Sequence, residues 1–313
     1  MKTKKIKGFT LPEILTVMVI IAIMVSILMP ALSKVKRLAK DVKQKAQIVS
    51  IEMGVTIYKN DFGEYPPSHG SNAPADSYSF SYCGAQTLAE AMFGQDMLGF
   101  HTESTYINEG KDNTIPNTSK LYIYPTMPDL DRTTSLSKRK EPYLDRTNIS
   151  VFTPQDIFDK DTYSSVPGMV VSDRYVICDV FTAVNREING KTYKVGTPVL
   201  YFRANPSAFN TQLIPYPITP TDHARNIYNW RDNYFLVGQG KITDGKEHPL
   251  CPIGTDMTKA RSGERFYGFI GDPMIPNLNR PVRPESFLLI SAGNDGLYGT
   301  KDDICNFDPN LPN

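Results

Sequence analysis

The chain has 313 residues, of which 40% are hydrophobic and 21% are charged, and its formal net charge is +1. This length suffices for a sizeable core even when one membrane segment is set aside, so we expect one membrane-tethered domain with long insertions. The net charge becomes −3 when the four lysines among the first seven residues are left out. This value gives no indication of a nucleic-acid partner.

The first 30 residues place those lysines and a Gly8-Phe9 junction before about twenty apolar residues, a run that only Glu13 interrupts. A secretory signal peptide would carry its cleavage site of small residues after the apolar run instead. By hydropathy alone, the stretch is typical of an ordinary single-span anchor or an uncleaved signal anchor. A carboxylate in a membrane segment costs roughly 2.5–3.5 kcal/mol, so we expect Glu13 to have a specific partner.

The stretch resembles the class III signal of type IV pilins and type II secretion pseudopilins, and the residues that carry the resemblance are Gly8, Phe9, Thr10, Leu11, Glu13 and Pro30. The resemblance implies that a prepilin peptidase cuts after Gly8 and methylates the new N-terminal Phe9. It also implies an assembly role for Glu13, which would pair with the terminal ammonium of a neighbouring subunit. Pro12 departs from the family pattern, which has leucine there, but a helix tolerates proline in its first turn.

Basic residues flank the apolar run on both sides, so charge alone does not orient the span. They are Lys2, Lys4, Lys5 and Lys7 before the run, and Lys34, Lys36, Arg37, Lys40, Lys43 and Lys45 after it. The resemblance implies a cytoplasmic N-terminus and a single-pass inner-membrane protein whose C-terminal domain lies in the periplasm.

The helical period continues beyond the apolar run, and we expect one helix from near Phe9 to about Asn60. We expect its outer half to pack on the domain. The apolar face that contacts a sheet would be widened by Ile48, Ile51, Val55 and Tyr58. The stripe that sets the period consists of Val35, Leu38, Val42, Ala46, Val49, Met53 and Ile57.

Pro30 lies where this helix would leave the bilayer, and it removes the hydrogen bond to the Ser26 carbonyl. The resemblance implies a stretch that can lose helicity in an assembled filament. A plain kink at the membrane exit is the alternative.

The remainder indicates an α+β fold: a long transmembrane and amphipathic helix packed on a small antiparallel sheet, pilin-like, with long inserted loops. We expect a short helix at 86–93, loop-rich chain at 102–173, a hairpin turning at Asn189-Gly190, and strands at 175–183, 193–195, 199–203, 234–237 and 287–291. We divide the chain into a leader (1–8), a transmembrane and assembly helix (9–32), its periplasmic continuation (33–62), a loop-rich insertion (63–173) and a sheet with an Asp/Gly loop (174–313).

The segment from Ser291 to Ile304 combines three carboxylates with three glycines, a composition that can fold oxygen atoms around Ca²⁺. It resembles the C-terminal calcium loop of the major type II secretion pseudopilins. The resemblance implies side-chain ligands from Asp295, Asp302 and Asp303, a carbonyl ligand from Ala292 and a weaker ligand in Ser291. The alternative is a solvated turn whose Asn and Asp side chains cap their own backbone.

No catalytic motif stands out: the four histidines are scattered, and Asp222-His223 and Glu247-His248 are typical of solvated turns. The cluster around Trp230 favours core packing over a carbohydrate or protein contact face. The cysteines lack a metal-binding spacing and would be disulfides or buried thiols; they are Cys83, Cys178, Cys251 and Cys305.

The resemblance therefore implies a non-enzymatic subunit of a type II secretion pseudopilus. Its partners would be a prepilin peptidase, identical or related pilin-like subunits, the secretion assembly platform and the inner membrane. An adhesive or ligand-binding type IV pilin, of the minor class, is the leading alternative, and a membrane-tethered enzyme that borrows the signal is the third.

Overall fold

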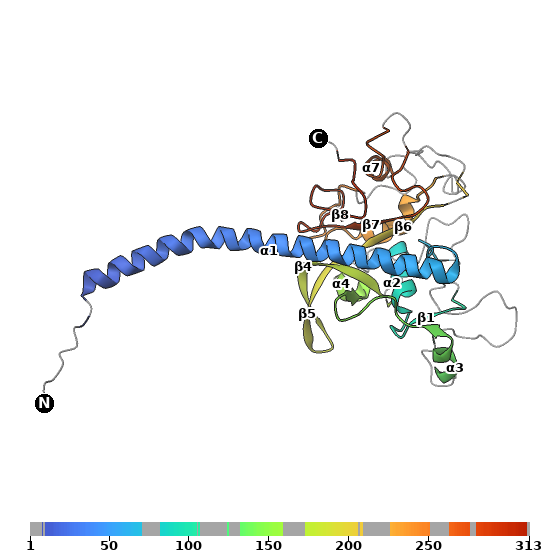
Figure 1. The fold of residues 1–313 in the computed structure, drawn as a ribbon, viewed down its shortest axis with the longest axis horizontal. Coiled ribbons are helices and arrows are strands. Elements are labelled where there is room, and N and C mark those ends of the chain that lie inside the picture. The colour runs from blue at the N-terminus through green and yellow to red at the C-terminus, as the bar shows by residue number, and fades with distance from the viewer. Residues whose placement is uncertain are drawn as a thin grey trace. The chain divides into compact units, whose positions relative to one another are not determined.

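The computed structural model describes residues 8, 10–70, 82–104, 106, 124, 132–158, 173–205, 207–208, 226–250, 263–275 and 280–311. The chain divides into two compact units, residues 1–43 and residues 44–313, and each is described by itself. Figure 1 labels the elements along the chain.

The first helix, α1, runs from Leu11 to Phe62, which confirms the single long helix expected from the sequence. It ends at Gly63, whose φ of 82° places it in the left-handed region that glycine occupies without strain. The N–H of Gly63 donates to the carbonyl of Lys59 over 2.7 Å, which closes the last turn.

In the unit formed by residues 44–313, α1 packs through Ile48, Ile51, Val55 and Tyr58, as expected, but the stripe that was also expected to pack does not. Ala46, Val49, Met53 and Ile57 are exposed, so the prediction that this stripe packs on the domain is wrong. The buried positions are Gln44, Gln47, Ile48, Ile51, Gly54, Val55 and Tyr58. The error arises because the helix has two apolar faces, and the period alone did not show which one the domain covers.

The buried face tolerates two glutamines because the neighbouring strand satisfies them. The strand β4 (Val176–Ile188) accepts a hydrogen bond from Gln47 Nε2 at the carbonyl of Cys178, over 2.8 Å. Its Val180 N–H donates to Gln44 Oε1 over 2.9 Å. These side chains supply to one strand the hydrogen bonds that a further strand would make.

In the described parts of the second unit, three small antiparallel sheets replace the one expected sheet. β4 pairs with β3 (Ser150–Phe152) and with β5 (Lys191–Pro198), and the β4–β5 hairpin turns at Asn189 and Gly190, both with positive φ, as expected. The second sheet has the order β6 (Leu200–Arg203), β7 (Phe287–Ser291), β8 (Ile304–Cys305). The third pairs β1 (Phe100–His101) with β2 (Arg139–Lys140).

The expected strand at 234–237 is wrong, because these residues form the helix α6 (Tyr234–Gly238). It follows directly on the 3₁₀ helix η2 (Trp230–Asn233), which Asn229 caps by accepting a hydrogen bond from the N–H of Arg231. Trp230 is buried in the core, as expected.

The remaining described helices are short. They are α2 (Gly84–Phe93), α3 (Arg132–Ser137), α4 (Pro154–Ile157) and α7 (Glu264–Phe269). The helix α2 covers the expected short helix and is buried along its whole length. Described parts of the segment 102–173 contain β2, β3, α3 and α4.

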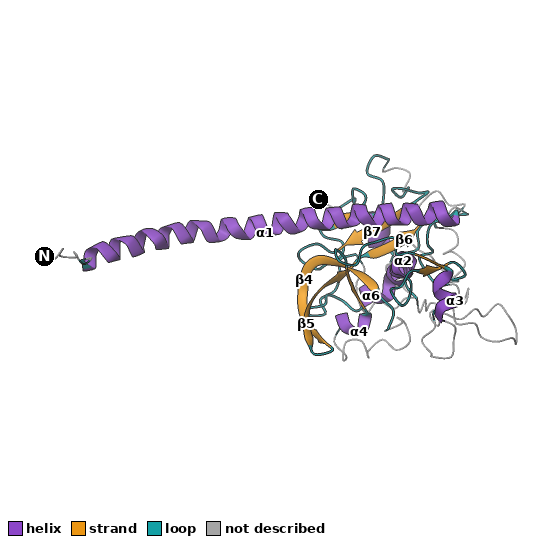
Figure 2. Ribbon diagram, turned by 60° about the horizontal axis from the view of Figure 1, so that its bottom comes forward, coloured by secondary structure: helices purple, strands orange, loops and turns teal. Residues whose placement is uncertain are grey.

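Two apolar clusters form the core of the second unit, and β4 and β6 contribute alternate side chains to each. The first cluster gathers α6, α7 and η2 around Phe202 and Leu288. The second joins residues 48–58 of α1 to α2 and to Tyr201 and Leu289, so this part of α1 lies across β4, β6 and β7 (Figure 2).

Three cysteines, Cys83, Cys178 and Cys305, are free thiols in the structure. Burial raises the pKa of each thiol above its usual value. Cys251 lies outside the described residues.

Candidate functional sites at the two ends of the chain

The N-terminal signal residues begin α1 with a local hydrogen-bonded cap. Glu13 Oε2 accepts hydrogen bonds from the N–H of Thr10 over 2.8 Å and from its hydroxyl over 2.7 Å. Thr10 precedes the helix and Glu13 is its third residue, which is the spacing of a capping box. Glu13 therefore has a partner within its own chain, which the sequence analysis missed although the Thr-x-x-Glu pattern predicts it. Gly8 is exposed, and Phe9 lies outside the described residues.

The apolar residues that follow Glu13 have no protein surface to cover them. Among the described residues, α1 is the helix that is long and apolar enough to cross a membrane by its length and composition. All large apolar side chains from Ile14 to Leu32 are exposed in the structure. A soluble environment would penalise this surface, whereas the hydrocarbon core of a bilayer does not.

Pro30 lies inside α1, and the helix continues through it. The neighbouring hydroxyls bond to carbonyls of the preceding turn: Ser26 Oγ donates to Ile23 over 2.7 Å, and Ser33 Oγ donates to Met29 over 3.2 Å. Since proline has no N–H, the carbonyl of Ser26 lacks its usual helical donor. The backbone of the apolar half therefore lacks one helical hydrogen bond at this position.

The exposed stripe of α1 within the second unit consists of Val49, Met53 and Ile57, with exposed fractions of 53%, 62% and 46%. These residues follow each other at intervals of four, so they share one face of the helix. The side chains that pack on the domain lie on another face of the same turns. The helix therefore presents an uncovered apolar surface beside its buried one.

At the other end of the chain, a tight loop joins β7 to β8. Gly293, Gly296 and Gly299 all have positive φ, which lets the backbone reverse direction repeatedly over few residues. Ser291 is buried, and its hydroxyl donates to Asp179 Oδ2 over 3.3 Å. Ala292 is also buried. The sequence analysis did not identify Asp179, because β4 brings it to the loop from far away along the chain.

The carboxylates of the loop organise its backbone. Asp302 Oδ2 accepts the N–H of Asp295 over 2.9 Å, and Asp303 Oδ2 accepts the N–H of Gly299 over 2.7 Å. Asp295 Oδ1 accepts the N–H of Leu297 over 2.8 Å, and the Thr300 hydroxyl donates to Asp302 over 2.7 Å. These bonds have the pattern of side chains that cap their own turn.

The three carboxyl groups differ in their affinity for protons. Burial raises the pKa of Asp303 to about 8, and burial together with the nearby Asp302 raises the pKa of Asp295. Burial acts in the same direction on Asp302, but hydrogen bonds from Thr300 and from backbone N–H groups outweigh it and lower its pKa. The carboxyl groups of Asp295 and Asp302 interact with each other, and their pKa values move in opposite directions, upward for Asp295 and downward for Asp302.

This donor set fits calcium only in part. Among the described residues, no group of three or more His, Cys, Asp and Glu side chains is arranged to hold a metal ion. The carboxyl groups of Asp295 and Asp302 lie close enough to interact, and carboxylate oxygens are ligands of the kind that Ca²⁺ takes. Asp303 accepts bonds from its own loop.

The loop is fixed to the domain through Tyr298 and His248. His248 Nδ1 accepts the N–H of Tyr298 over 3.1 Å, and the Tyr298 hydroxyl donates to the carbonyl of Pro198 in β5. Burial lowers the pKa of His248 to about 4, so the imidazole is neutral. With an exposed fraction of 2%, His248 is part of the core, and the expectation of a solvated turn at Glu247-His248 is wrong.

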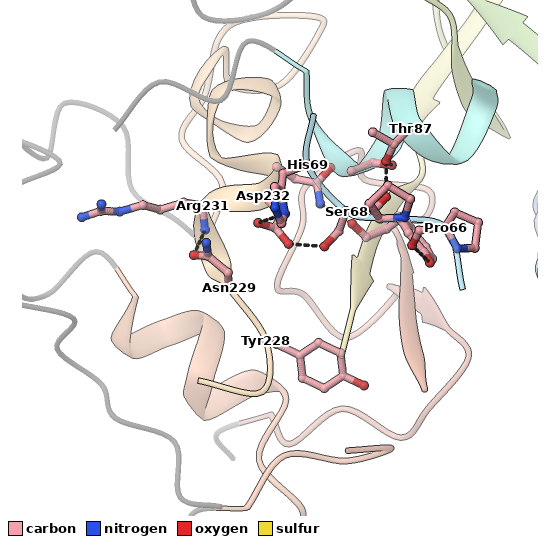
Figure 3. A network of polar contacts seen from close by, with 12 residues as sticks. Pro66, Ser68, His69, Thr87, Tyr228, Asn229, Arg231 and Asp232 are labelled. Atoms are coloured by element: carbon pink, nitrogen blue, oxygen red, sulfur yellow. Dashed lines mark hydrogen bonds and ion pairs between the residues drawn. The ribbon is translucent and has the colours of Figure 1, made fainter. Parts of the chain in front are cut away.

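The buried acid Asp232 of the second unit lies in a polar network (Figure 3). Ser68 Oγ donates to Asp232 Oδ2, and His69 Nδ1 lies 3.9 Å from Asp232 Oδ1. Burial raises the pKa of Asp232 to about 8. Because the single hydroxyl proton of Ser68 is directed to the acid, these residues do not form the Ser-to-His relay of a hydrolase. The network joins the segment after α1 to η2.

Comparison with known proteins finds a family model at the N-terminus and a relative that aligns with part of the chain. The family model described as the prokaryotic N-terminal methylation motif matches residues 3–29. The chain is 39% identical over 67 residues to the type II secretion system core protein G of Escherichia coli strain K12. The aligned residues are 21% of this chain and 46% of that relative, so the chain spans about half of the relative's length. No solved structure matches the chain.

The motif matches the segment in which the structure shows the capped start of α1 and the exposed apolar run. The small antiparallel sheets packed on the other half of α1 are consistent with a pilin-like α+β fold. The relative and the long apolar helix indicate anchoring in a membrane. Residues 3–29 therefore carry the prokaryotic N-terminal methylation motif, and the chain is similar in part to a type II secretion system core protein.

Proposed function

We propose that the protein is a structural subunit of a type II secretion pseudopilus, which a prepilin peptidase cuts between Gly8 and Phe9 and which assembles through α1. The observation that carries the proposal is the uncovered face of the helix at Val49, Met53 and Ile57. These residues belong to the second unit, whose own core leaves them exposed. An apolar face of this kind on a helix that also anchors in a bilayer is suited to contact with neighbouring subunits.

In this proposal the subunit is anchored in the inner membrane before assembly, with its C-terminal domain in the periplasm. A secretion assembly platform then extracts it and stacks its helix against those of identical or related subunits. The apolar run that faced lipid would face neighbouring helices in the fibre. The name of the matched relative supports a secretion system over a surface pilus.

Glu13 would change partner during this step. In the single subunit its carboxylate caps the helix by accepting two bonds from Thr10. Removal of residues 1–8 creates a terminal ammonium on Phe9, and the ammonium of a neighbouring subunit would then compete for the carboxylate. A pair of opposite charges away from water is a stronger interaction than the bonds of the Glu13 carboxylate to uncharged donors, so subunits would register where the two charges meet.

We also propose Ca²⁺ as a ligand of the C-terminal loop. Asp295 and Asp302 would contribute side-chain oxygens, and Asp303, the Ala292 carbonyl and Ser291 are the further candidates. All three carboxylates accept hydrogen bonds from the loop, but Asp295 and Asp302 also interact with each other, so this pair is the core of the proposed site. Bound cation would stabilise the loop surface that neighbouring subunits contact.

The exposed stripe can be tested by charge substitution. Met53→Glu should abolish fibre formation in cells that contain the peptidase and the assembly machinery, while the domain melts at an unchanged temperature. Met274→Glu is the matched control, because Met274 is also exposed, at 86%, and lies away from α1 in the sequence. Normal fibres from Met53→Glu would contradict the proposal, and so would equal loss from both variants.

A further inference from the structure

A cluster of basic residues follows the apolar run of α1 and is not used by the assembly proposal. We call it the basic neck: Lys34, Lys36, Arg37, Lys40 and Lys43. Asp41 is the single acidic residue among positions 34–43. The unit formed by residues 44–313 has the opposite character, with 25 basic against 31 acidic residues and a formal net charge of −6. Positive charge is therefore concentrated on the short segment nearest the membrane.

The length of the apolar run places the basic neck at the membrane surface. Residues 14–32 span about 28 Å along a helix, close to the ~30 Å hydrocarbon core. Residues 34–43 rise through the next ~15 Å, and the polar headgroup layer on one side of a bilayer is roughly 5–8 Å thick. Lys34, Lys36 and Arg37 lie at headgroup depth, and the long side chains of Lys40 and Lys43 can reach back towards it.

The structure leaves these cations accessible. Lys34, Lys36, Arg37 and Lys43 are exposed, and Lys40 is half-buried. Within the described part of the chain, no salt bridge involves Lys34, Lys36, Lys40 or Lys43. Lys36, Lys40 and Lys43 follow each other at intervals of four and three, so they share one face of the helix.

The position of the neck distinguishes it from an ordinary solvated charge run. Basic residues close to a membrane span favour the cytoplasmic side of the membrane. A basic cluster on the periplasmic side therefore opposes the orientation that the proposed function requires. Clusters of four or more Lys and Arg beside a membrane helix attract anionic headgroups. The exposed Val35, Leu38 and Val42 add apolar contact at the same depth, as in interfacial amphipathic helices.

We propose that the basic neck binds the headgroups of anionic phospholipids on the periplasmic face of the inner membrane. The inference rests on the proposed placement of residues 34–43 outside the span. Extraction of a subunit into a fibre would then break these lipid contacts as well as remove the helix from the bilayer. The acidic domain of a second copy is the alternative occupant, and the test separates the two.

The experiment places the full chain in phosphatidylcholine vesicles that contain trace spin-labelled phosphatidylglycerol or spin-labelled phosphatidylcholine. Electron paramagnetic resonance measures the fraction of each labelled lipid in contact with the protein. Phosphatidylglycerol should associate about threefold more strongly than phosphatidylcholine at 0.1 M salt, and the preference should fall towards onefold at 1 M salt. The variant K34Q/K36Q/K40Q/K43Q should lose the preference at both salt concentrations.

Two control variants remove the same charge elsewhere. K2Q/K4Q/K5Q/K7Q removes the leader cations, and K138Q/K191Q/K194Q/K246Q removes cations of the domain. Each should keep at least half of the wild-type preference. If the wild type shows no preference, or if the neck variant keeps it, the proposal is wrong.

Cross-linking in the same vesicles tests the alternative occupant. If the neck variant loses contacts between copies but keeps the lipid preference, the neck binds a second copy and the proposal is wrong. A chain that fails to insert shows no immobilised lipid of either kind, which refutes the membrane placement and this inference together. Failure of fibre assembly alone leaves the lipid result unchanged, so the two proposals fail separately.

Discussion

The two ends of the chain differ in how far apart in the sequence their interacting residues lie. The N-terminal signal is local, since Thr10 and Glu13 bond within one helical turn and the apolar run follows without interruption. The C-terminal loop depends on partners far away in the sequence, such as Asp179, His248 and Pro198. Changes at the first end should therefore alter assembly without altering the stability of the domain, whereas changes at the second should alter stability first.

Among the variants, Glu13→Gln is expected to separate the effect on assembly from the effect on domain stability most strongly. Glutamine can still cap the helix from this position, but it lacks the charge that would pair with a neighbouring ammonium. Fibres should be absent, while membrane insertion and domain melting stay normal. Thr10→Ala is the matched variant, since it removes the hydroxyl bond of the cap, weakens the helix start by about 1 kcal/mol, and keeps both the backbone N–H bond and the charge of Glu13. Fibres from Glu13→Gln, or their loss in Thr10→Ala alone, would assign the function of Glu13 to capping.

Gly293→Ala should give the largest loss of stability at the other end. Gly293 has a φ of 63°, and a β-carbon there would collide with the backbone carbonyl of Asp302. We expect a loss of roughly 3 kcal/mol in the free energy of unfolding, from strain and collision together. Gly245→Ala is the control, because Gly245 has a φ of 66° and open space around it, so about 1 kcal/mol of strain alone is expected. Denaturant titration of both variants checks the difference.

His248 should make the domain sensitive to acid. Its pKa is about 4 in the folded state, below the usual 6.5, so the unfolded chain binds the proton more tightly. The contribution of this residue is fully present above pH 6.5 and is lost as the pH falls towards 4, by about 3 kcal/mol at most. In His248→Gln the amide oxygen can still accept the N–H of Tyr298, so melting temperatures should fall less over this pH range. An unchanged acid profile would contradict the assignment.

Asp303 should produce the opposite pH dependence when no cation is bound. Its folded pKa of about 8 lies above the usual 3.8, so its contribution is present below pH 3.8 and is lost as the pH rises to 8. Asp303→Asn should flatten the alkaline side of the stability profile. Ca²⁺ should raise the melting temperature more at pH 8 than at pH 5, since the cation competes with protons.

The calcium response has its own matched variant. Asp295→Asn with Asp302→Asn keeps the capping oxygens of the loop but removes both charges of the shared pair. This double variant should melt as the wild type does without calcium and should lose the calcium response. A wild-type domain whose melting is indifferent to calcium and chelator would leave the loop a self-capped turn.

The sequence was sufficient for elements whose pattern is local and repeated. The long helix, the short helix before Phe93 and the Asn189-Gly190 hairpin all depend on period or turn chemistry within a few residues. The segment at 234–237 was mispredicted, because a short apolar run has the same composition in a buried strand and in a buried helix. The cap at Asn229, which begins η2, is the local signal that favours the helix.

The burial of two glutamines on α1 could not be predicted from the sequence, for a different reason. Gln44 and Gln47 look like solvent-facing residues, yet β4 supplies each with a hydrogen-bond partner and the core closes around them. The exposed stripe looked like core because it is more uniformly apolar. The loop carboxylates were recognised from composition, but their bonds depend on the fold, and so does the burial of His248.

The central claim is that α1 acts between subunits after its leader has been removed. Mass spectrometry of the protein isolated from its native membrane tests this most directly. The account predicts a chain that lacks residues 1–8 and begins with an N-methylated Phe9. A mature chain that still begins at Met1, or one cut at another position, would contradict it, because Glu13 would then have no ammonium at the required place on a neighbouring helix.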